Sequence, residues 1–210
     1  AGFFQPDLWP RDTAIPDRHT LALPSDLPPG RYRLELGLYP PGRPDGTLIV
    51  EDGDRLALAS LTVGIDPAAP QPAERTDIDF GGQMRLLGYD LQRDSSGMVH
   101  VTLHWQSLAA MGRDYTVFVH IVGPDGTIVA QDDAPPGDPF FPTSTWLPGD
   151  FVSGPHHMAL PANTTPGDYV LLVGLYHQPT AERLQAADSS GRPLGDAPPL
   201  VTITAGAEAP

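Results

Sequence analysis

One short sequence occurs twice in this chain and limits the folds that the chain can adopt. The first copy, RYRLELGLY, covers residues 31–39, and the second, DYVLLVGLY, covers residues 168–176. Each copy follows a Pro-Gly or Gly-containing turn and alternates large apolar residues with others, a period of two that is typical of a β-strand. The two copies lie 137 residues apart, and the same offset aligns Trp9 with Trp146. Matches at aromatic, glycine and proline positions indicate that a β-rich unit is duplicated.

The composition agrees with an all-β fold. The 210 residues are 40% hydrophobic, which is enough to build a packed core. The 26 prolines and 22 glycines stand mainly in turn dipeptides between short apolar runs, and no window shows a helical period. We therefore expect an antiparallel β-sandwich of the immunoglobulin-like or jelly-roll type.

Short apolar runs bounded by turn residues mark the expected strands. The sequence GPDGT at residues 123–127 separates two of these runs and is typical of a hairpin loop in which Gly126 takes a positive φ. The expected strands are residues 19–23, 31–39, 47–50, 55–63, 84–91, 98–107, 115–122, 127–131, 157–160, 169–177, 183–186 and 200–204.

The duplication also predicts the domain organisation. Residues 77–206 form a complete module, followed by a short tail at 207–210. Residues 1–64 match only the second half of that module, so we expect a partial module whose first half precedes it in a longer parent protein. Residues 65–76, rich in proline and alanine, form a linker. Half a sandwich exposes an apolar face, so the partial module is expected to dock on the complete one or on another chain.

The outward-facing residues differ between the two copies of the repeated strand. The outer positions of the first copy carry Arg33 and Glu35, whereas the second copy has Val170 and Leu172 there. Polar residues suit a face in water, and apolar residues suit a covered face. We therefore predict an interface at Val170 and Leu172.

Charge and cysteine content exclude several classes of function. The formal net charge is −14, from 26 acidic and 12 basic residues, which disfavours binding to the phosphates of nucleic acids. The sequence has no cysteine, so disulfides, thiol nucleophiles and cysteine-ligated zinc are excluded. No apolar run approaches the ~20 residues of a membrane-spanning helix.

Aromatic and acidic residues concentrate in QDDAPPGDPFFPTSTWLPGD, residues 131–150. Trp146 could stack on a sugar ring while Asp132 and Asp133 accept hydrogen bonds from its hydroxyls, so these three residues are candidate glycan contacts. The aspartates and nearby hydroxyls also suit a calcium ion, and no other cofactor is expected. The corresponding residues 2–12 keep the aromatic side chains but fewer aspartates, which favours a third interpretation, packing shared by both copies.

Three histidines form a candidate metal site. Period-two alternation turns His100 and His104 outward on the strand at 98–107, and His120 outward on the strand at 115–122. If these strands pair through the turn between them, the three imidazoles share one patch and could bind zinc. A solvated polar face is the alternative interpretation.

The sequence carries no catalytic signature. It has no GxSxG motif, and Ser144 and Ser153 have no obvious base in their sequence neighbourhood. As neighbours on a strand, Asp132 and Asp133 would point to opposite faces, which is the wrong arrangement for an acid–base pair acting on one substrate. We therefore predict that this region is not an enzyme.

Five motifs occur in order along the complete module. They are GGQMRLLGYDL (81–91), VTLHWQSL (101–108), DYTVFVHIVGPDGTIVAQDDAPP (114–136), PTSTWLPGD (142–150) and MALPANTTPGDYVLLVGLYHQPTAERL (158–184). In this set the chain resembles the tandem C-terminal β-sandwich modules of bacterial polytopic membrane glycosyltransferases, of the protein-mannosyltransferase or lipid-linked-sugar type. The resemblance covers residues 77–205 and, as a half copy, residues 3–64.

This resemblance implies a noncatalytic accessory region on the extracytoplasmic side of a membrane-anchored parent that uses a polyprenyl-phosphate sugar donor. The catalytic groups of such enzymes lie in the transmembrane core, so no catalytic residue is carried over to this chain. The region would contact the glycan or protein acceptor of the parent. Two other interpretations stay open: a structural spacer or assembly module without a ligand, and a stand-alone glycan-active hydrolase.

Overall fold

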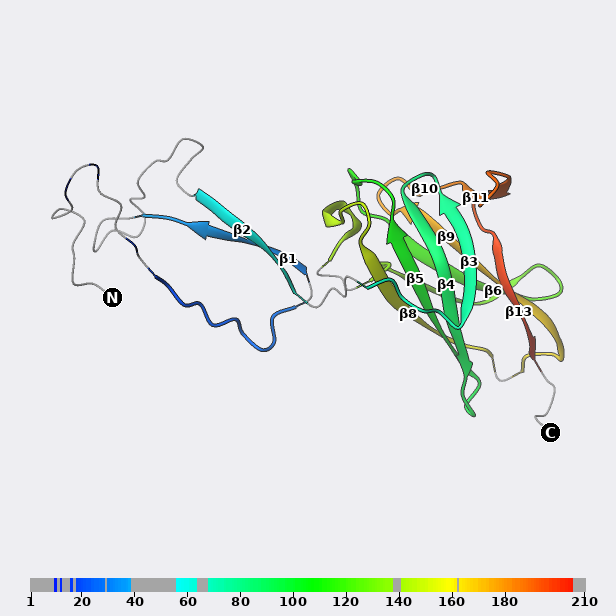
Figure 1. Ribbon diagram of the computed structural model, residues 1–210. Coiled ribbons are helices and arrows are strands. Elements are labelled where there is room, and N and C mark those ends of the chain that lie inside the picture. The colour runs from blue at the N-terminus through cyan, green and yellow to red at the C-terminus, as the bar shows by residue number, and fades with distance from the viewer. Residues whose placement is uncertain are drawn as a thin grey trace.

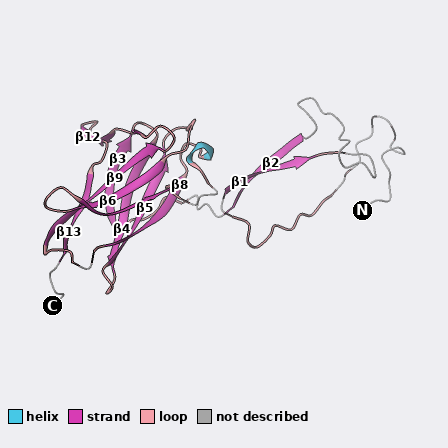
Figure 2. Cartoon of the chain, turned by 180° about the vertical axis from the view of Figure 1, so that it is seen from behind, coloured by secondary structure: helices cyan, strands magenta, loops and turns pink. Residues whose placement is uncertain are grey.

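The computed structural model confirms the all-β fold (Figure 1). The described strands form a two-stranded hairpin and two larger sheets that pack as a sandwich. One short 3₁₀ helix, Thr143–Thr145, accompanies them (Figure 2). The structure describes residues 18–28, 30–38, 56–63, 68–137, 141–161 and 163–205, together with Pro10, Asp12 and Pro16.

The two larger sheets are antiparallel throughout. One has the strand order β12-β11-β3-β4-β5-β8, and the other has the order β10-β9-β6-β7 with β13 also paired to β9. The strands of the sandwich are β3 (Glu74–Phe80), β4 (Met84–Arg93), β5 (Met98–Ser107), β6 (Thr116–Val122), β7 (Ile128–Ala134), β8 (Phe151–Ala159), β9 (Gly167–His177), β10 (Glu182–Arg183), β11 (Ala186–Asp188), β12 (Pro193–Gly195) and β13 (Pro199–Ala205).

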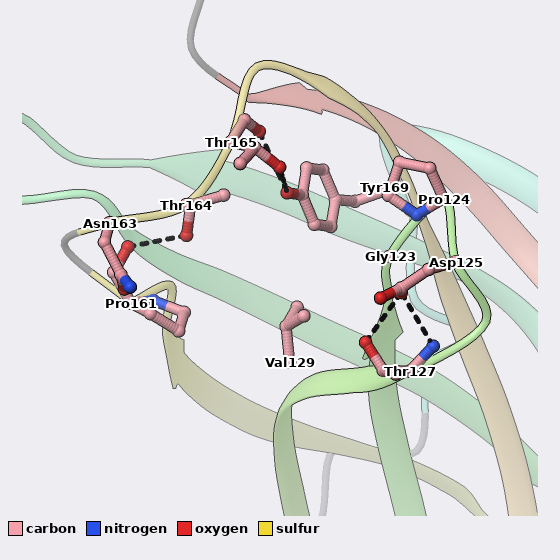
Figure 3. Close-up of a pocket in the computed structure, with 10 residues that line it drawn as sticks. All are labelled: Gly123, Pro124, Asp125, Thr127, Val129, Pro161, Asn163, Thr164, Thr165 and Tyr169. Carbon is pink, nitrogen blue, oxygen red and sulfur yellow. Dashed lines mark hydrogen bonds between the residues drawn. The ribbon is translucent and has the colours of Figure 1, made fainter.

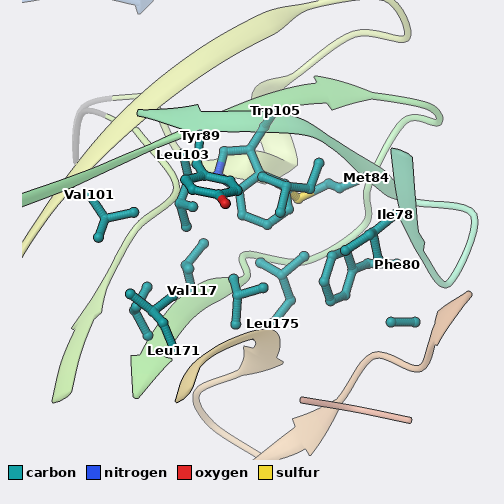
Figure 4. Packing of buried hydrophobic residues seen from close by; sticks show 14 of the residues in the cluster. Ile78, Phe80, Met84, Tyr89, Val101, Leu103, Trp105, Val117, Leu171 and Leu175 are labelled. Atoms are coloured by element: carbon teal, nitrogen blue, oxygen red, sulfur yellow. The ribbon is translucent and has the colours of Figure 1, made fainter. Parts of the chain in front are cut away.

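Apolar side chains from the two sheets meet in one core (Figure 4). Every second residue of β5 from Val99 to Trp105 is at most 1% exposed, and Leu171 and Val173 on β9 are 0% exposed. Figure 4 shows Leu103 and Trp105 facing residues of the opposite sheet across this core. The alternation in the sequence predicted the inward set on β5, because one face of a half-buried strand is apolar.

Most strands lie where the sequence predicted them, and β5 has the predicted bounds. Four predictions need correction. The strand expected at 183–186 is divided between β10 and β11. β8 starts at Phe151, well before the predicted start at His157. β3 begins at Glu74, inside the predicted linker, because polar residues at most of its positions conceal its alternation. Residues 19–23 form no strand, and the strand expected at 47–50 lies outside the described residues.

The hairpin of β1 (Gly30–Leu36) and β2 (Leu56–Val63) has the same pairing geometry as β9 with β13. In each pair, the first residue of the first strand lies opposite the last residue of the second strand. Both ladders then shift register at equivalent points, after Leu34 in β1 and after Leu171 in β9. The offset of 137 residues that relates the sequences therefore also relates two β-bulges.

A tyrosine hydrogen bond occurs in both pairs. Tyr32 Oη donates to the carbonyl of Pro28 at 2.8 Å, and Tyr169 Oη donates to the carbonyl of Thr165 at 2.9 Å. A tyrosine that ties its hydroxyl to the backbone a few residues upstream fixes the entry of a strand into a sandwich.

The outer faces of the two repeated strands carry charged side chains on β1 and apolar side chains on β9. Arg33 and Glu35 form an ion pair on β1, and Arg31 pairs with Asp150 in the loop before β8. On β9, Val170 and Leu172 are half-buried. Near-complete exposure of both residues would have contradicted an interface, and it is not observed, so the interface stays a prediction.

Candidate functional site

The outer face of the six-stranded sheet carries a line of polar side chains. Alternation turns every second residue of β5 and β8 away from the core, and antiparallel pairing places these residues side by side. We call them the outer track, whose successive pairs are Gln106 and Phe151, His104 and Ser153, Thr102 and Pro155, and His100 and His157.

A chain of hydrogen bonds crosses the outer track at His104. Its Nδ1 lies 2.7 Å from Ser153 Oγ, and its Nε2 lies 2.9 Å from Oδ2 of Asp90 on β4. The other oxygen of this carboxylate accepts a 2.7 Å hydrogen bond from the amide of Ala73. That backbone hydrogen bond, followed by the one from His104, lowers the pKa of Asp90. The charged carboxylate therefore holds the orientation of an imidazole that is only 8% exposed.

A second polar pair lies at the far end of the outer track. His100 Nδ1 and His157 Nδ1 are 2.9 Å apart, and Asp94 Oδ2 lies 3.2 Å from His100 Nε2. The hydroxyl of Ser96 and then His100 lower the pKa of Asp94 to about 2. Hydrogen-bonded polar side chains thus lie at two points of the track, with the hydroxyl of Thr102 between them.

A hollow of about 350 Å³ lies at the other end of the track. Its wall combines the apolar surfaces of Leu87 and Phe151 with the amide of Gln106 and the guanidinium groups of Arg75 and Arg85. Ligand sites typically join a concave apolar surface with a few convergent polar groups. The hollow and the adjoining outer track together form the candidate site.

No family is identified. Neither the known protein families nor the curated proteins contain a match to this sequence. Among solved structures, one described as "Crystal structure of the C-terminal domain of wzt" matches 64% of this chain and 77% of its own, at 14% identity and a TM-score of 0.37. Similarity at this level supports no inference about function. The described residues contain no helix with the length and hydrophobicity needed to span a membrane.

Another hollow, of about 330 Å³, lies at one end of the sandwich between the β6–β7 and β8–β9 loops (Figure 3). Several of its polar groups already have partners. Asp125 Oδ1 accepts hydrogen bonds from the amide and hydroxyl of Thr127, and Tyr169 Oη donates to the carbonyl of Thr165. Like those of the outer track, these polar groups are therefore hydrogen-bonded within the protein. The loop has the Gly126 conformation that the sequence predicted, with φ of 82°.

Trp146 is not available to a sugar, so its prediction as a glycan contact is wrong. The side chain is 1% exposed, and its ring stacks on Phe141 with centroids 5.8 Å apart. Its Nε1 donates a 2.9 Å hydrogen bond to the Phe141 carbonyl. Phe141 and Trp146 are therefore packing elements, which was the third interpretation of the sequence.

The two candidate aspartates lie on opposite faces of β7, as alternation predicted. Asp132 Oδ2 lies 3.0 Å from Nδ1 of the buried His156, at the edge where β7 meets β8. Asp133 instead accepts a 3.0 Å hydrogen bond from Tyr176 Oη on the outer face of the five-stranded sheet. Burial and then Asp133 raise the pKa of Tyr176. Neither carboxylate belongs to the outer track.

The predicted patch of three histidines does not form. His100 and His104 face outward from β5 as expected, but His120 lies on β6 in the other sheet. β5 pairs with β4 and β8, because the connection after Ser107 crosses between sheets instead of closing a hairpin. Within the described part of the chain, no group of three or more histidine, aspartate or glutamate residues could hold a metal ion. The zinc and calcium interpretations therefore gain no support from these residues.

The buried His156 is expected to make the fold less stable in acid. Burial lowers its pKa, an effect that Asp132 and Asp133 oppose and His157 reinforces. In the unfolded chain this histidine takes up a proton below its usual pKa of about 6.5, whereas in the folded chain it stays neutral to a lower pH. The free energy of unfolding therefore falls as the pH drops below about 6.5. Melting temperatures from about pH 7.5 to about pH 5.5 measure the fall, and His156→Gln should reduce its slope.

A matched variant separates this effect from that of His120, a partly buried imidazole on the other sheet. Burial also lowers the pKa of His120, so His120→Gln should reduce the slope to a smaller extent. If the melting temperature of the His156→Gln protein falls with pH as steeply as that of the parent, the loss of stability in acid comes from carboxylates and not from His156.

Proposed function

We propose that the sandwich is a noncatalytic glycan-binding module whose ligand lies along the outer track and enters the hollow beside it. One observation carries the proposal: the hollow is lined by Gln106 and Phe151, which are also the first pair of the outer track, so the hollow and the track adjoin. Sugars present hydroxyls around an apolar ring face, so they suit a surface with planar polar groups beside an aromatic side chain. A sheet face with several residue pairs in a row accommodates an extended oligosaccharide.

The charges of the site favour a neutral or partly cationic glycan over a polyanionic one. The chain has a net charge of −14, and Asp90 and Asp94 flank the track as charged carboxylates. The guanidinium of Arg85 is paired with Asp77 at 3.2 Å, so the hollow is not a strongly positive pocket. Hydroxyl groups are therefore the ligand groups that this surface recognises.

We place the module, as part of the same proposal, in an extracytoplasmic accessory region of a membrane-anchored glycosyltransferase. The five ordered motifs of the complete module support this context through their resemblance to such regions. In that setting, the glycan on the outer track is the acceptor or product of the parent enzyme, or part of a glycosylated protein acceptor.

A glycan array followed by calorimetry with the best-bound oligosaccharide tests the proposal. Gln106→Ala is expected to weaken binding about tenfold or more, because it removes an amide that adjoins both the track and the hollow. Gln131→Ala is the matched control, since Gln131 is exposed on the outer face of the other sheet opposite His120. Binding to no oligosaccharide would overturn the proposal and leave the structural spacer.

The Ser153–His104–Asp90 chain favours a second candidate function, hydrolysis of an ester on the glycan. A serine within hydrogen-bonding distance of an imidazole that a carboxylate orients is the arrangement of an activated nucleophile. Here Nδ1 faces the serine and Nε2 faces the carboxylate, the reverse of the usual use of the ring nitrogens in serine hydrolases. Labelling by a fluorophosphonate that Ser153→Ala abolishes would establish Ser153 as an activated nucleophile, and an unlabelled parent protein would exclude this candidate function.

A further inference from the structure

One face of the β1–β2 hairpin is apolar and exposed. Leu34 and Leu36 on β1 are 38% and 40% exposed, and Leu56 and Leu61 on β2 are 50% and 38% exposed. The register places Leu36 opposite Leu56 and Tyr32 opposite Leu61, so these side chains lie on one face. Four exposed leucines on one face of a hairpin are an unfavourable surface for a chain in water.

The equivalent residues of the sandwich are buried. Leu34 and Leu36 correspond to Leu171 and Val173 on β9, and both of these are 0% exposed. The six-stranded sheet covers them, with Trp105 of β5 in the same core cluster (Figure 4). The sandwich therefore shows which kind of surface fits the leucine face of the hairpin.

One edge of β1 also has no partner strand among the described residues. Its counterpart β9 pairs with β13 on one side and with β6 on the other. Within the described residues, β1 pairs with β2 alone, which is the counterpart of β13. An open edge offers a row of unpaired backbone groups to a further strand. The hairpin thus presents an open edge and an open apolar face together.

We propose that the hairpin is a docking surface for a polypeptide segment of the kind that forms β3–β7 in the sandwich. Such a segment would add a β6-like strand to the edge of β1 and cover the leucine face with a sheet like β4 and β5. A second copy of this chain does not fit, because its own β3–β7 already pack against β9. The opposite face is less suited, because it carries the Arg33–Glu35 ion pair and because Arg31 on that face already pairs with Asp150 of the sandwich.

Residues 18–22 support this choice of occupant. The offset of 137 residues places them on residues 155–159, the second part of β8, which pairs with β5. Residues 18–22 are nevertheless exposed and form no strand. Because β5 belongs to the β3–β7 set, a strand can form here only when such a set is docked. This explains why the strand predicted at 19–23 does not form.

A chain extended at its start tests the proposal. Residues 74–138 are copied in front of Gly2, so that the added segment precedes the hairpin at the spacing found in the sandwich. Amide hydrogen exchange in β1 and β2 is expected to slow about 100-fold or more, and residues 18–22 should gain protection. The amides of β9 and β13 in the same molecule serve as the internal reference.

Variants of the extended chain identify the docking face. Leu34→Asp combined with Leu61→Asp is expected to remove the protection, whereas Arg33→Ala on the opposite face should keep it. Unchanged exchange in β1 and β2 of the extended chain overturns the proposal, whether or not the added segment folds. A dimer of the unextended chain with protected hairpin amides also overturns it, because the occupant is then a second copy.

Discussion

Trp105→Ala is expected to lower the free energy of unfolding of the sandwich by about 3–5 kcal/mol. Trp105 is 0% exposed, and its ring meets that of Phe80 edge-on with centroids 5.7 Å apart. It lies on β5 with β4 on one side and β8 on the other, so the surrounding backbone cannot collapse into the space left by an alanine. Urea unfolding followed by far-ultraviolet circular dichroism measures the loss without depending on tryptophan fluorescence.

Trp105→Phe is the matched variant. Among the described residues, Trp105 Nε1 has no hydrogen-bond partner, so phenylalanine removes ring volume but no hydrogen bond. We expect a loss of about 1.5 kcal/mol or less. Equal losses for the two variants would contradict the cavity explanation, and would indicate that the indole nitrogen has a partner that matters more than packing.

Alternation is the part of the fold that the sequence predicts best. The inward position of Trp105 follows from the alternation of apolar and polar residues along β5 alone, because which side chains of a strand share a face depends only on their order in the sequence. Pairing does not follow in this way. Residues 108–114 could close a hairpin or cross to the other sheet, and the backbone hydrogen bonds that Ser107 makes with Gly149 and Asp150 come from a distant segment. The predicted histidine patch was wrong because it assumed the hairpin.

The candidate site was hidden for the same reason. Ser153 has no base near it in the sequence, and His104 reaches it only because β5 pairs with β8. Trp146 shows a different limit: a tryptophan among prolines and aspartates looks exposed, yet its loop folds back and buries it. The duplication contained the relevant signal, since Trp9 occupies the position equivalent to Trp146 whereas Ala1 and Thr13 occupy those equivalent to Asp138 and Asp150.

Gly174→Ala is expected to destabilise the sandwich by about 3 kcal/mol, at the upper end of the usual cost of overpacking. A Cβ at this position on β9 would lie 2.2 Å from Phe118 Cζ and 2.4 Å from the carbonyl oxygen of Asp196. The carbonyl belongs to the backbone, and the guanidinium of Arg183 lies over the Phe118 ring, 4.5 Å from its centroid. Neither neighbour can therefore move away without disturbing the outer face of the sheet.

Gly112→Ala is the control for this substitution, measured in the same thermal unfolding assay. Gly112 is exposed in the connection between β5 and β6, and a Cβ there meets no atom within 4 Å. Alanine should be neutral there or stabilise the fold by about 0.4–1 kcal/mol, because it restricts the unfolded chain. The difference between the two variants isolates the contact at Gly174. Equal melting temperatures would mean that Phe118 yields easily, and the outer face of β9 would then be an open surface rather than a packed one.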